Sequence, residues 1–302
     1  DTDAGRIFAR SRGDGPPLVL LHGFPQTHAM WHRIAPALAE THTVVCIDLR
    51  GYGWSSVPRS DPGHERYSKR AMGQDVVTVM EALGHVRFAV AGHDRGARVG
   101  YRLALDQPGR VERLALLDIL PTVVNWQRIR SGFPAPHWEF LARPSPEPES
   151  EIGRDPRAYF DGLLAQWTAN GTLDAFDPRA LAAYRAGSNE PNRVHAFCED
   201  YRAGATVDVA ADKADLAAGR RIVCPTLVLT GDGYLTRGGA TEAPLDVWRR
   251  TFAPEATGAK VRSGHFVAEE NPESTLTALA PFLAGGDERA RDLPFSVEGR
   301  QG

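Results

Sequence analysis

Short apolar runs alternate with longer segments of helical spacing along most of this chain. The apolar runs bounded by turn residues are predicted to be buried strands: Leu18–Leu21, Val44–Ile47, Phe88–Ala91, Leu114–Leu117 and Thr226–Leu229. Between them, Trp31–Ala39 and Ser68–Leu83 have helical spacing. The second segment starts at Ser68, a residue type favoured at N-caps, and stops at Gly84. This alternation predicts an α/β fold, with a parallel sheet and helices on both faces.

The same pattern divides the chain into four parts. Residues 1–121 and 216–284 hold the strand-like runs and are expected to form one core with a single sheet. Residues 122–215 contain many aromatic residues and a proline-rich stretch but no strand-like run, which predicts a helical cap inserted over the carboxyl ends of the strands. Residues 285–302 are polar and are expected to be a tail that carries no chemistry.

Composition excludes several other classes of protein. Hydrophobic residues make up 42% and charged residues 24%, which is typical of a soluble globular protein with a sizeable core. A formal net charge of −3 provides no basic field for nucleic acid or an anionic membrane, and no apolar run approaches the roughly 18 residues of a membrane span. The three cysteines lack CxxC spacing, so neither a disulfide framework nor a zinc site is expected, and a cytoplasmic location fits best.

A candidate nucleophile follows the third predicted strand. Gly92-His-Asp-Arg-Gly-Ala97 leads from Phe88–Ala91 into a helical segment, Arg98–Leu105, and this strand, tight turn and helix are typical of the nucleophile elbow of an α/β-hydrolase fold. The residue at the turn is Asp94, and the helix N-terminus favours its anionic form. A carboxylate can displace a leaving group at saturated carbon to form an alkyl ester, so alkyl halides or epoxides are the expected substrates. The alternative is that Asp94 only caps the helix.

The ester would need a base and an oxyanion hole for its hydrolysis. His265, in a loop before the final predicted helix, is the candidate base, since the nucleophile, acid, histidine order is typical of this fold. Either Asp118 or Asp232 can orient it, because each follows a predicted strand. The backbone N–H groups of Phe24 and Arg95 are the candidate oxyanion hole.

Over most of residues 15–283 the sequence resembles the fluoroacetate (haloacetate) dehalogenases of the α/β-hydrolase superfamily. The motifs that carry the resemblance are His22-Gly-Phe-Pro-Gln26, Asp48-Leu-Arg-Gly-Tyr-Gly53, Gly92-His-Asp-Arg-Gly96, Asp118–Thr122, Cys198-Glu-Asp-Tyr-Arg-Ala203 and Gly264-His265-Phe266. The resemblance favours Asp118 over Asp232 as the orienting acid. The glycine-rich segment Thr230–Glu242 does not match the pattern, which keeps Asp232 as an alternative.

The resemblance also implies two binding groups. Arg95 and Arg98 stand where the family holds the substrate carboxylate, and both can reach an anion beside Asp94. His137, Trp138 and Tyr201 match the family's halide donors, which are hydrogen-bond donors that strengthen as the leaving halide gains charge. The implied substrate is a short 2-haloacid, and the products are a hydroxy acid and halide. No metal or organic cofactor is implied, and a homodimer is expected.

Two rival functions share most of these residues. An epoxide hydrolase would use Asp94 and His265 together with cap tyrosines, for which Tyr159, Tyr184 and Tyr201 are candidates. A neutral epoxide, however, gives no use for two arginines beside the nucleophile. A non-catalytic small-molecule receptor of the same fold is the second rival, and intact catalytic residues argue against it.

Overall fold

The structure is a computed structural model that describes residues 1–239 and 242–285. Within them, strands β1–β7 form one sheet in the order β1-β3-β2-β4-β5-β6-β7, in which β1 is antiparallel to β3 and the other neighbours are parallel. The strands are β1 (Ala9–Arg12), β2 (Pro17–Leu21), β3 (Thr43–Ile47), β4 (Phe88–His93), β5 (Val111–Leu117), β6 (Thr226–Thr230) and β7 (Thr257–Lys260).

The five predicted strands are all present, as the central strands β2 to β6. Every residue of β4 is buried, as expected for a parallel strand covered by helices on both faces. The two strands that the sequence did not predict are the edges of the sheet. β1 has the sequence ARSR with three exposed residues, and β7 alternates between partly buried and exposed positions, so neither has an apolar run.

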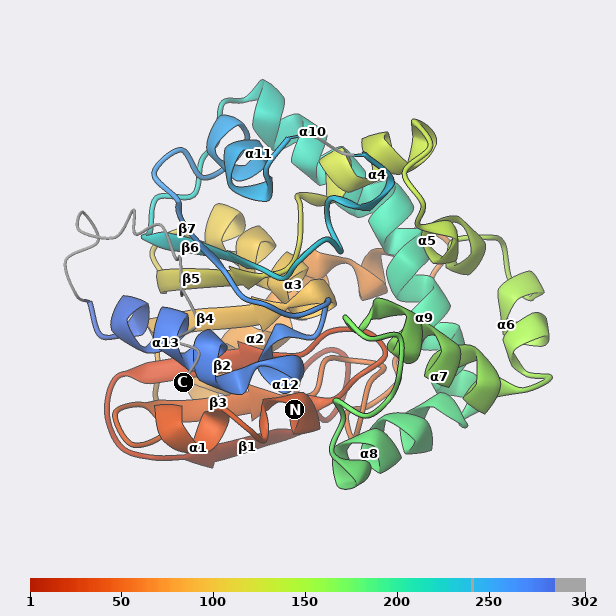
Figure 1. Ribbon diagram of the computed structural model, residues 1–302, viewed down its shortest axis with the longest axis horizontal. Helices are drawn as coiled ribbons and strands as arrows, with labels where there is room; N and C mark the ends of the chain where they lie inside the picture. The colour runs from red at the N-terminus through yellow and green to blue at the C-terminus, as the bar shows by residue number, and fades with distance from the viewer. Residues whose placement is uncertain (240–241, 286–302) are drawn as a thin grey trace, which may run out of the picture.

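Helices of the core lie on both faces of the sheet (Figure 1). They are α1 (Ala35–Leu38), α2 (Lys69–Ala82), α3 (Asp94–Asp106), α11 (Pro244–Arg250), α12 (Val267–Glu270) and α13 (Pro272–Leu283), with the short 3-10 helices η1 (His28–Trp31), η2 (Glu65–Tyr67) and η4 (Arg237–Gly239). The prediction for α2 is confirmed, because the Ser68 side chain accepts a hydrogen bond from the Ala71 N–H at its start. At its end, Gly84 has the positive φ of 87° that favours glycine.

The predicted helix over Trp31–Ala39 is wrong. The chain forms two short pieces there, η1 and α1, instead of one continuous helix. Pro36 lies in the first turn of α1, where its missing N–H costs no hydrogen bond. In a helix that began at Trp31 the same proline would remove a bond from the interior, so the helix divides before it.

Between β5 and β6 the chain forms only helices, which lie together beside the sheet in Figure 1. They are α4 (Thr122–Arg130), α5 (Pro136–Leu141), α6 (Glu147–Ile152), α7 (Pro156–Trp167), α8 (Pro178–Ser188), α9 (Pro191–Ala203), the π-helix η3 (Gly204–Asp208) and α10 (Val209–Ala217). We call α4 to α10 the helical segment. Its last three pieces run on without a break, so that η3 is a π-bulge within one long helix, a feature frequent at functional sites.

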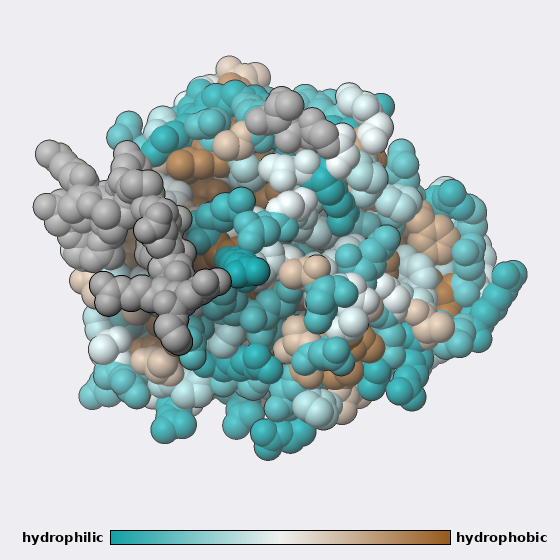
Figure 2. Space-filling view, in the orientation of Figure 1, coloured by the Kyte–Doolittle hydropathy of each residue, from teal (hydrophilic) through white to brown (hydrophobic). Residues whose placement is uncertain are grey.

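The surface in Figure 2 is mostly hydrophilic on the face shown, and its hydrophobic patches are small and separated. Among the described residues, no helix has both the length and the apolar character needed to cross a membrane. The polar tail predicted for residues 285–302 lies outside the described residues, except for Gly285.

Candidate active site

The turn between β4 and α3 presents Asp94 at the carboxyl end of the sheet. Asp94 has a φ of 44°, a strained conformation for a residue with a side chain. The two flanking glycines allow the chain to pack this closely. A Cβ on Gly92 would lie 2.6 Å from Ala97, and one on Gly96 would lie 2.3 Å from the carbonyl oxygen of Leu21. The sharp turn predicted from the sequence is therefore present, and its geometry admits only small neighbours.

The two carboxylate oxygens of Asp94 have different surroundings. The Phe24 backbone N–H donates to Oδ1 at 3.3 Å, whereas His265 Nε2 lies 3.5 Å from Oδ2. The second predicted donor, the Arg95 backbone N–H, makes no hydrogen bond to this carboxylate in the described structure. Burial acts to raise the pKa of Asp94, but His265 and the positive charges of Arg98 and Arg95 outweigh it and hold the pKa well below its ordinary value. Asp94 is therefore an anion.

His265 is oriented by Asp118. Its Nδ1 lies 2.7 Å from Asp118 Oδ2, and the other oxygen of Asp118 accepts from the Gly231 N–H at 3.0 Å. Asp118 also has a positive φ, 54°, at the end of β5. Burial acts to lower the pKa of His265, but the hydrogen bonds and charges of Asp118 and Asp94 raise it above its ordinary value.

Asp232, the other acid that the sequence left open, faces elsewhere. Its side chain is 48% exposed and pairs with Lys260 at 2.9 Å. The two acids therefore differ in a simple way: Asp118 is buried against the imidazole, and Asp232 is a surface ion pair. Of the two, only Asp118 contacts His265.

Arg95 is held by an acid that the sequence reasoning did not single out. Its guanidinium donates through Nε and Nη2 to the buried Asp200 carboxylate, with Nε 3.1 Å from both oxygens. Lys69 and Tyr52 also donate to Asp200. Burial acts to raise the pKa of Asp200, but the charges of Arg95 and Lys69 lower it to about 2. Only Nη1 of Arg95 is left buried without a hydrogen-bond partner.

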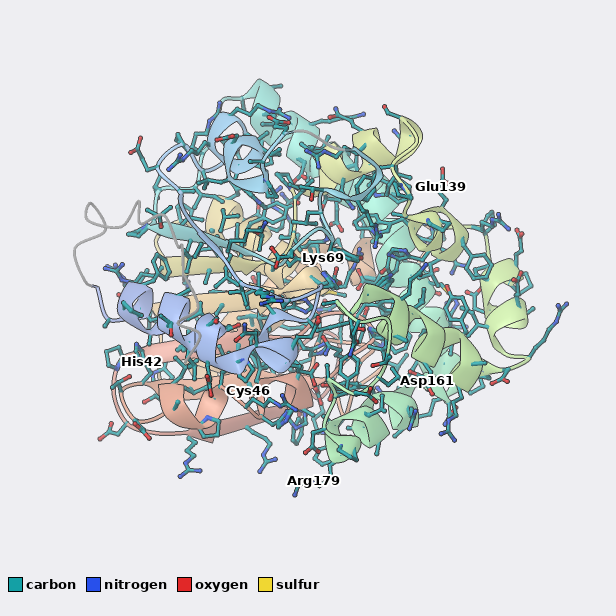
Figure 3. All side chains as sticks on the ribbon, in the orientation of Figure 1. His42, Cys46, Lys69, Glu139, Asp161 and Arg179 are labelled. Carbon is teal, nitrogen blue, oxygen red and sulfur yellow. The ribbon has the colours of Figure 1, made fainter. Side chains whose placement is uncertain are left out.

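The π-bulge lies against this buried ion pair. A Cβ on Gly204, the first residue of η3, would lie 3.2 Å from Arg95 Nη2. Lys69, which shares Asp200 with Arg95, is buried as well, and Figure 3 shows it far from surface residues such as Arg179. The bulge and the glycine together admit the guanidinium beside the helix. The motif Cys198–Ala203 contained Asp200, but nothing in its pattern indicated that its partner would be Arg95.

Arg98, one turn further along α3, has a different environment. Its Nη1 donates to the Leu120 carbonyl at 3.0 Å and to Thr122 Oγ1 at 3.1 Å, and its guanidinium carbon lies 4.6 Å from the centre of the Trp138 ring. Its Nε is buried without a partner. In the described structure Arg98 makes no ion pair. Its charge is therefore available to an anion beside Asp94.

The three predicted halide donors meet in one aromatic cluster. The Trp138 and Tyr201 rings are 5.6 Å apart, and His137 lies 6.0 Å from Tyr201. Burial lowers the pKa of His137 to about 3 and raises the pKa of Tyr201 well above its ordinary value. Both groups are therefore neutral near pH 7 and can donate hydrogen bonds. Of the other two cap tyrosines, Tyr184 already donates to Glu269 at 2.9 Å, and Tyr159 packs edge-on against Phe160.

A tyrosine that the sequence reasoning missed stacks on the candidate base. The rings of Tyr234 and His265 are 3.9 Å apart and inclined by 23°. Tyr234 belongs to the glycine-rich segment 230–242, which gave no helical or strand pattern and no motif. Only the folded loop brings it to the imidazole.

The cavity at Asp94 is small. It has a volume of about 10 Å³, roughly the space for the centre of one water molecule, and its lining includes Asp94, Arg98, Asp118, Trp138 and Arg237. Sites for drug-sized ligands are far larger. The enclosed space at Asp94 is therefore far smaller than such a site.

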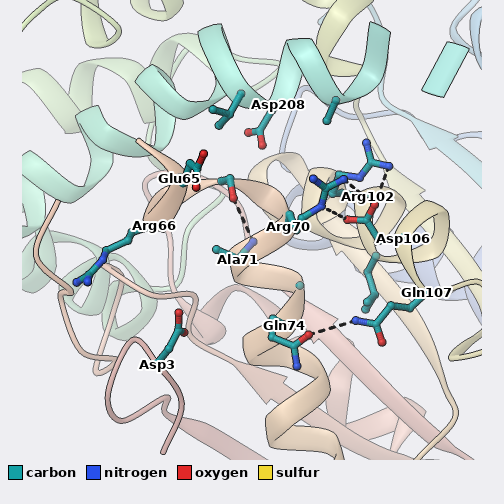
Figure 4. Close-up of a pocket in the computed structure, with 15 residues that line it drawn as sticks. Asp3, Glu65, Arg66, Arg70, Ala71, Gln74, Arg102, Asp106, Gln107 and Asp208 are labelled. Atoms are coloured by element: carbon teal, nitrogen blue, oxygen red, sulfur yellow. Dashed lines mark hydrogen bonds and ion pairs between the residues drawn. The ribbon is translucent and has the colours of Figure 1, made fainter. Parts of the chain in front are cut away.

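A groove of about 730 Å³ lies elsewhere, between α2, α3 and η3 (Figure 4). Its charged groups are largely satisfied by one another: Arg70 donates twice to Asp106, at 2.8 and 3.0 Å, and Arg102 pairs with Asp106 at 3.1 Å. It lacks a nucleophile and base in contact. The smaller cavity is therefore the one that can support chemistry. Among the described residues, no cluster of histidine, cysteine or acidic side chains has an arrangement suited to a metal ion.

Comparison with known proteins places this chain in a family. A family model described as the alpha/beta hydrolase fold matches residues 16–272. The chain belongs to the alpha/beta hydrolase family. The α/β-hydrolase fold predicted from the sequence is therefore confirmed.

Two curated relatives of this alpha/beta hydrolase cover nearly all of it. Fluoroacetate dehalogenase from Burkholderia sp is 45% identical over 278 residues, which are 90% of this chain and 88% of the relative. Soluble epoxide hydrolase from Corynebacterium sp. (strain C12) is 31% identical over 92% of this chain and 94% of its own. A solved structure from Nostoc sp PCC 7120, described only as an alpha/beta hydrolase, has a TM-score of 0.88 and 47% identity and covers 94% of this chain and 96% of that one.

Proposed function

We propose that this hydrolase cleaves the carbon–halogen bond of short 2-haloacids, such as fluoroacetate or chloroacetate, to a hydroxy acid and halide. The observation that carries the proposal is an anionic Asp94 with a paired imidazole on one side and arginines with neutral aromatic donors on the other. The 45% identity to a fluoroacetate dehalogenase supports the same substrate class.

In the first step, Asp94 Oδ2 attacks the carbon that carries the halogen. The carbon–oxygen bond forms as the carbon–halogen bond breaks, and the halogen leaves with the electron pair. The arginines hold the substrate carboxylate, so the reacting atoms meet without a search for orientation. Because Nε and Nη2 of Arg95 are already bound to Asp200, Arg95 offers Nη1 and Arg98 offers Nε. His137, Trp138 and Tyr201 donate to the growing charge of the halide.

In the second step, His265 takes a proton from water, which attacks the carbonyl carbon of the ester. The Phe24 N–H that donates to Asp94 Oδ1 stabilises the oxyanion formed there. Ester formation also prepares the base. It removes the negative charge of Asp94, one of the two charges that raise the pKa of His265, so the pKa falls when a neutral imidazole is needed.

An epoxide hydrolase is the second candidate, because Tyr201 lies close enough to Asp94 for its ionisation to be affected by that carboxylate, and a relative of 31% identity bears that name. A protonated phenol there can donate to an epoxide oxygen. The buried charges of Arg95 and Arg98 favour an anionic substrate over a neutral epoxide.

The test is halide release by the purified protein from fluoroacetate and chloroacetate in parallel, with an epoxide as the comparison substrate. Release from both haloacids is expected. Chloride release alone would keep the ester mechanism and remove the fluoride assignment. Epoxide opening without halide release would mean that the protein is an epoxide hydrolase, the second candidate.

A further inference from the structure

The cavity at Asp94 is lined by a second arginine, besides Arg98, that neither the sequence pattern nor the proposed mechanism uses. Arg237 lines the cavity together with Arg98 and Asp94. It begins the short 3-10 turn η4 after β6, and the next residue, Gly238, has a φ of 71°, which a residue with a side chain adopts only at a cost. Arg237 therefore reaches the cavity from the loop after β6, whereas Arg95 and Arg98 belong to α3.

Aromatic rings hold Arg237 in place. Its guanidinium carbon lies 4.2 Å from the centre of the Tyr234 ring and 5.5 Å from that of Phe133. Tyr234 in turn stacks on His265. Contacts of this kind orient a guanidinium but leave its positive charge uncompensated.

No acid in the described structure forms an ion pair with Arg237, and its Nε is buried without a hydrogen-bond partner. The acid five residues further along the chain, Glu242, pairs with Arg250 at 2.6 Å and lies 3.8 Å from Arg128. Arg95, by contrast, forms a buried ion pair with Asp200. Arg237 is thus a cavity cation with an unused donor, which costs free energy unless an anion is bound.

The halide side of the site is the place where such an anion would stand. Arg237 is near enough to His137 for its charge to disfavour protonation of that imidazole, and His137 belongs to the cluster of Trp138 and Tyr201. The substrate carboxylate is already served by Arg95 and Arg98 from α3. Arg95 and Arg98 lie over the rings of Trp138 and Tyr201. Arg237 reaches the same cluster from the other direction, because it lines the cavity at Asp94 together with Trp138.

We propose that Arg237 binds the halide ion, so that the halide site consists of neutral donors and one cation that holds the ion after the carbon–halogen bond has broken. This inference rests on the proposed function, since the halide is its product. A charge-assisted contact of this kind is roughly twice as strong as a neutral one, so its loss should weaken halide binding by about tenfold.

The test is equilibrium binding of chloride, bromide and iodide to the protein without substrate. Binding is measured by the quenching of tryptophan fluorescence. Arg237→Gln should raise the halide dissociation constant about tenfold, and Arg237→Lys, which keeps the charge, should restore most of the affinity. Arg128→Gln is the matched control, because Arg128 contacts the same loop through the Leu235 carbonyl but does not line the cavity. It should leave halide affinity unchanged.

Three results would overturn the inference. Unchanged halide affinity in Arg237→Gln would remove Arg237 from the halide site. Equal losses in Arg237→Gln, Arg237→Lys and Arg128→Gln would mean that the loop, not the charge, matters. Slower ester hydrolysis with unchanged halide binding would mean that Arg237 acts through Tyr234 on His265. Halide binding by a protein that releases no halide from haloacids would support this site while the proposed function failed.

Discussion

The strand ends and the helical segment contribute to one site by different physical means. Asp94 and Asp118 lie on turns after β4 and β5 and have positive φ angles, and Asp118 holds the His265 imidazole by a hydrogen bond. Trp138 and Tyr201 lie on helices and are positioned by ring contacts. In the proposed reaction the strand ends supply the groups that form and break bonds, whereas the helical segment supplies the donors for the halide.

The strand-end residues should show the largest losses of activity. Asp94→Asn removes the nucleophile but leaves a side chain of the same shape, so turnover of chloroacetate should fall by about 10⁴-fold or more. The measurement is steady-state halide release, with circular dichroism to show that the variant is folded. A variant that kept a tenth of the activity would exclude Asp94 as the nucleophile.

His265→Asn should separate the two steps. The nucleophile and arginines remain, so one equivalent of halide should be released, after which the ester stays on Asp94 because no base activates water. The mass of the intact protein should then increase by that of one carboxymethyl group. A variant that released one equivalent of halide without any gain in mass would contradict the ester.

The two candidate acids provide a matched pair. Asp118→Asn alters the hydrogen bond that orients His265 and should lower turnover by about 10⁴-fold. Asp232→Asn removes a surface ion pair and should leave turnover within about twofold of the unchanged protein. The reverse ranking in the halide-release assay would move the orienting role to Asp232.

In the helical segment, the expected effect on stability is larger than that on the chemical step. Asp200→Asn leaves Arg95 and Lys69 buried with less compensation, which should lower the free energy of unfolding by about 3–5 kcal/mol in urea. Asp161→Asn, which alters a partly exposed pair with Arg185, should cost about 1 kcal/mol or less. Equal costs for both variants would mean that the buried charges are not coupled.

Ester formation and ester hydrolysis should also differ in their dependence on pH, although this effect is smaller than those of the substitutions above. The charges of Asp118 and Asp94 raise the pKa of His265, and only the neutral imidazole accepts a proton from water. In the ester the charge of Asp94 is gone and Asp118 alone raises this pKa, so ester hydrolysis should slow as the pH falls through the pKa that His265 has in the ester. The first release of halide should continue over the same range, since Asp94 stays ionised. Rapid-quench measurement of both steps from pH 5 to 8 tests this, and parallel losses would refute it.

The sequence could indicate where Asp94 and His265 lie because both depend on local signals: glycines around Asp94, and a loop before the final helix for His265. The edge strands β1 and β7 had no such signal, since exposed strands need no apolar run. Asp200 and Arg237 were missed for another reason. Their partners, Arg95 and Tyr234 with Phe133, depend on how the helical segment and the β6 loop pack, which residue spacing does not determine.

The unequal surroundings of the two Asp94 oxygens have an isotopic consequence. In the proposed reaction the ester forms on Oδ2, and water adds to the carbon that both oxygens share, so the oxygen in the product alcohol comes from the protein and is replaced from solvent. Oδ1, held by the Phe24 N–H, stays. In water labelled with heavy oxygen, the first product would be unlabelled, and each later product would carry the atom that the protein took up one turnover before.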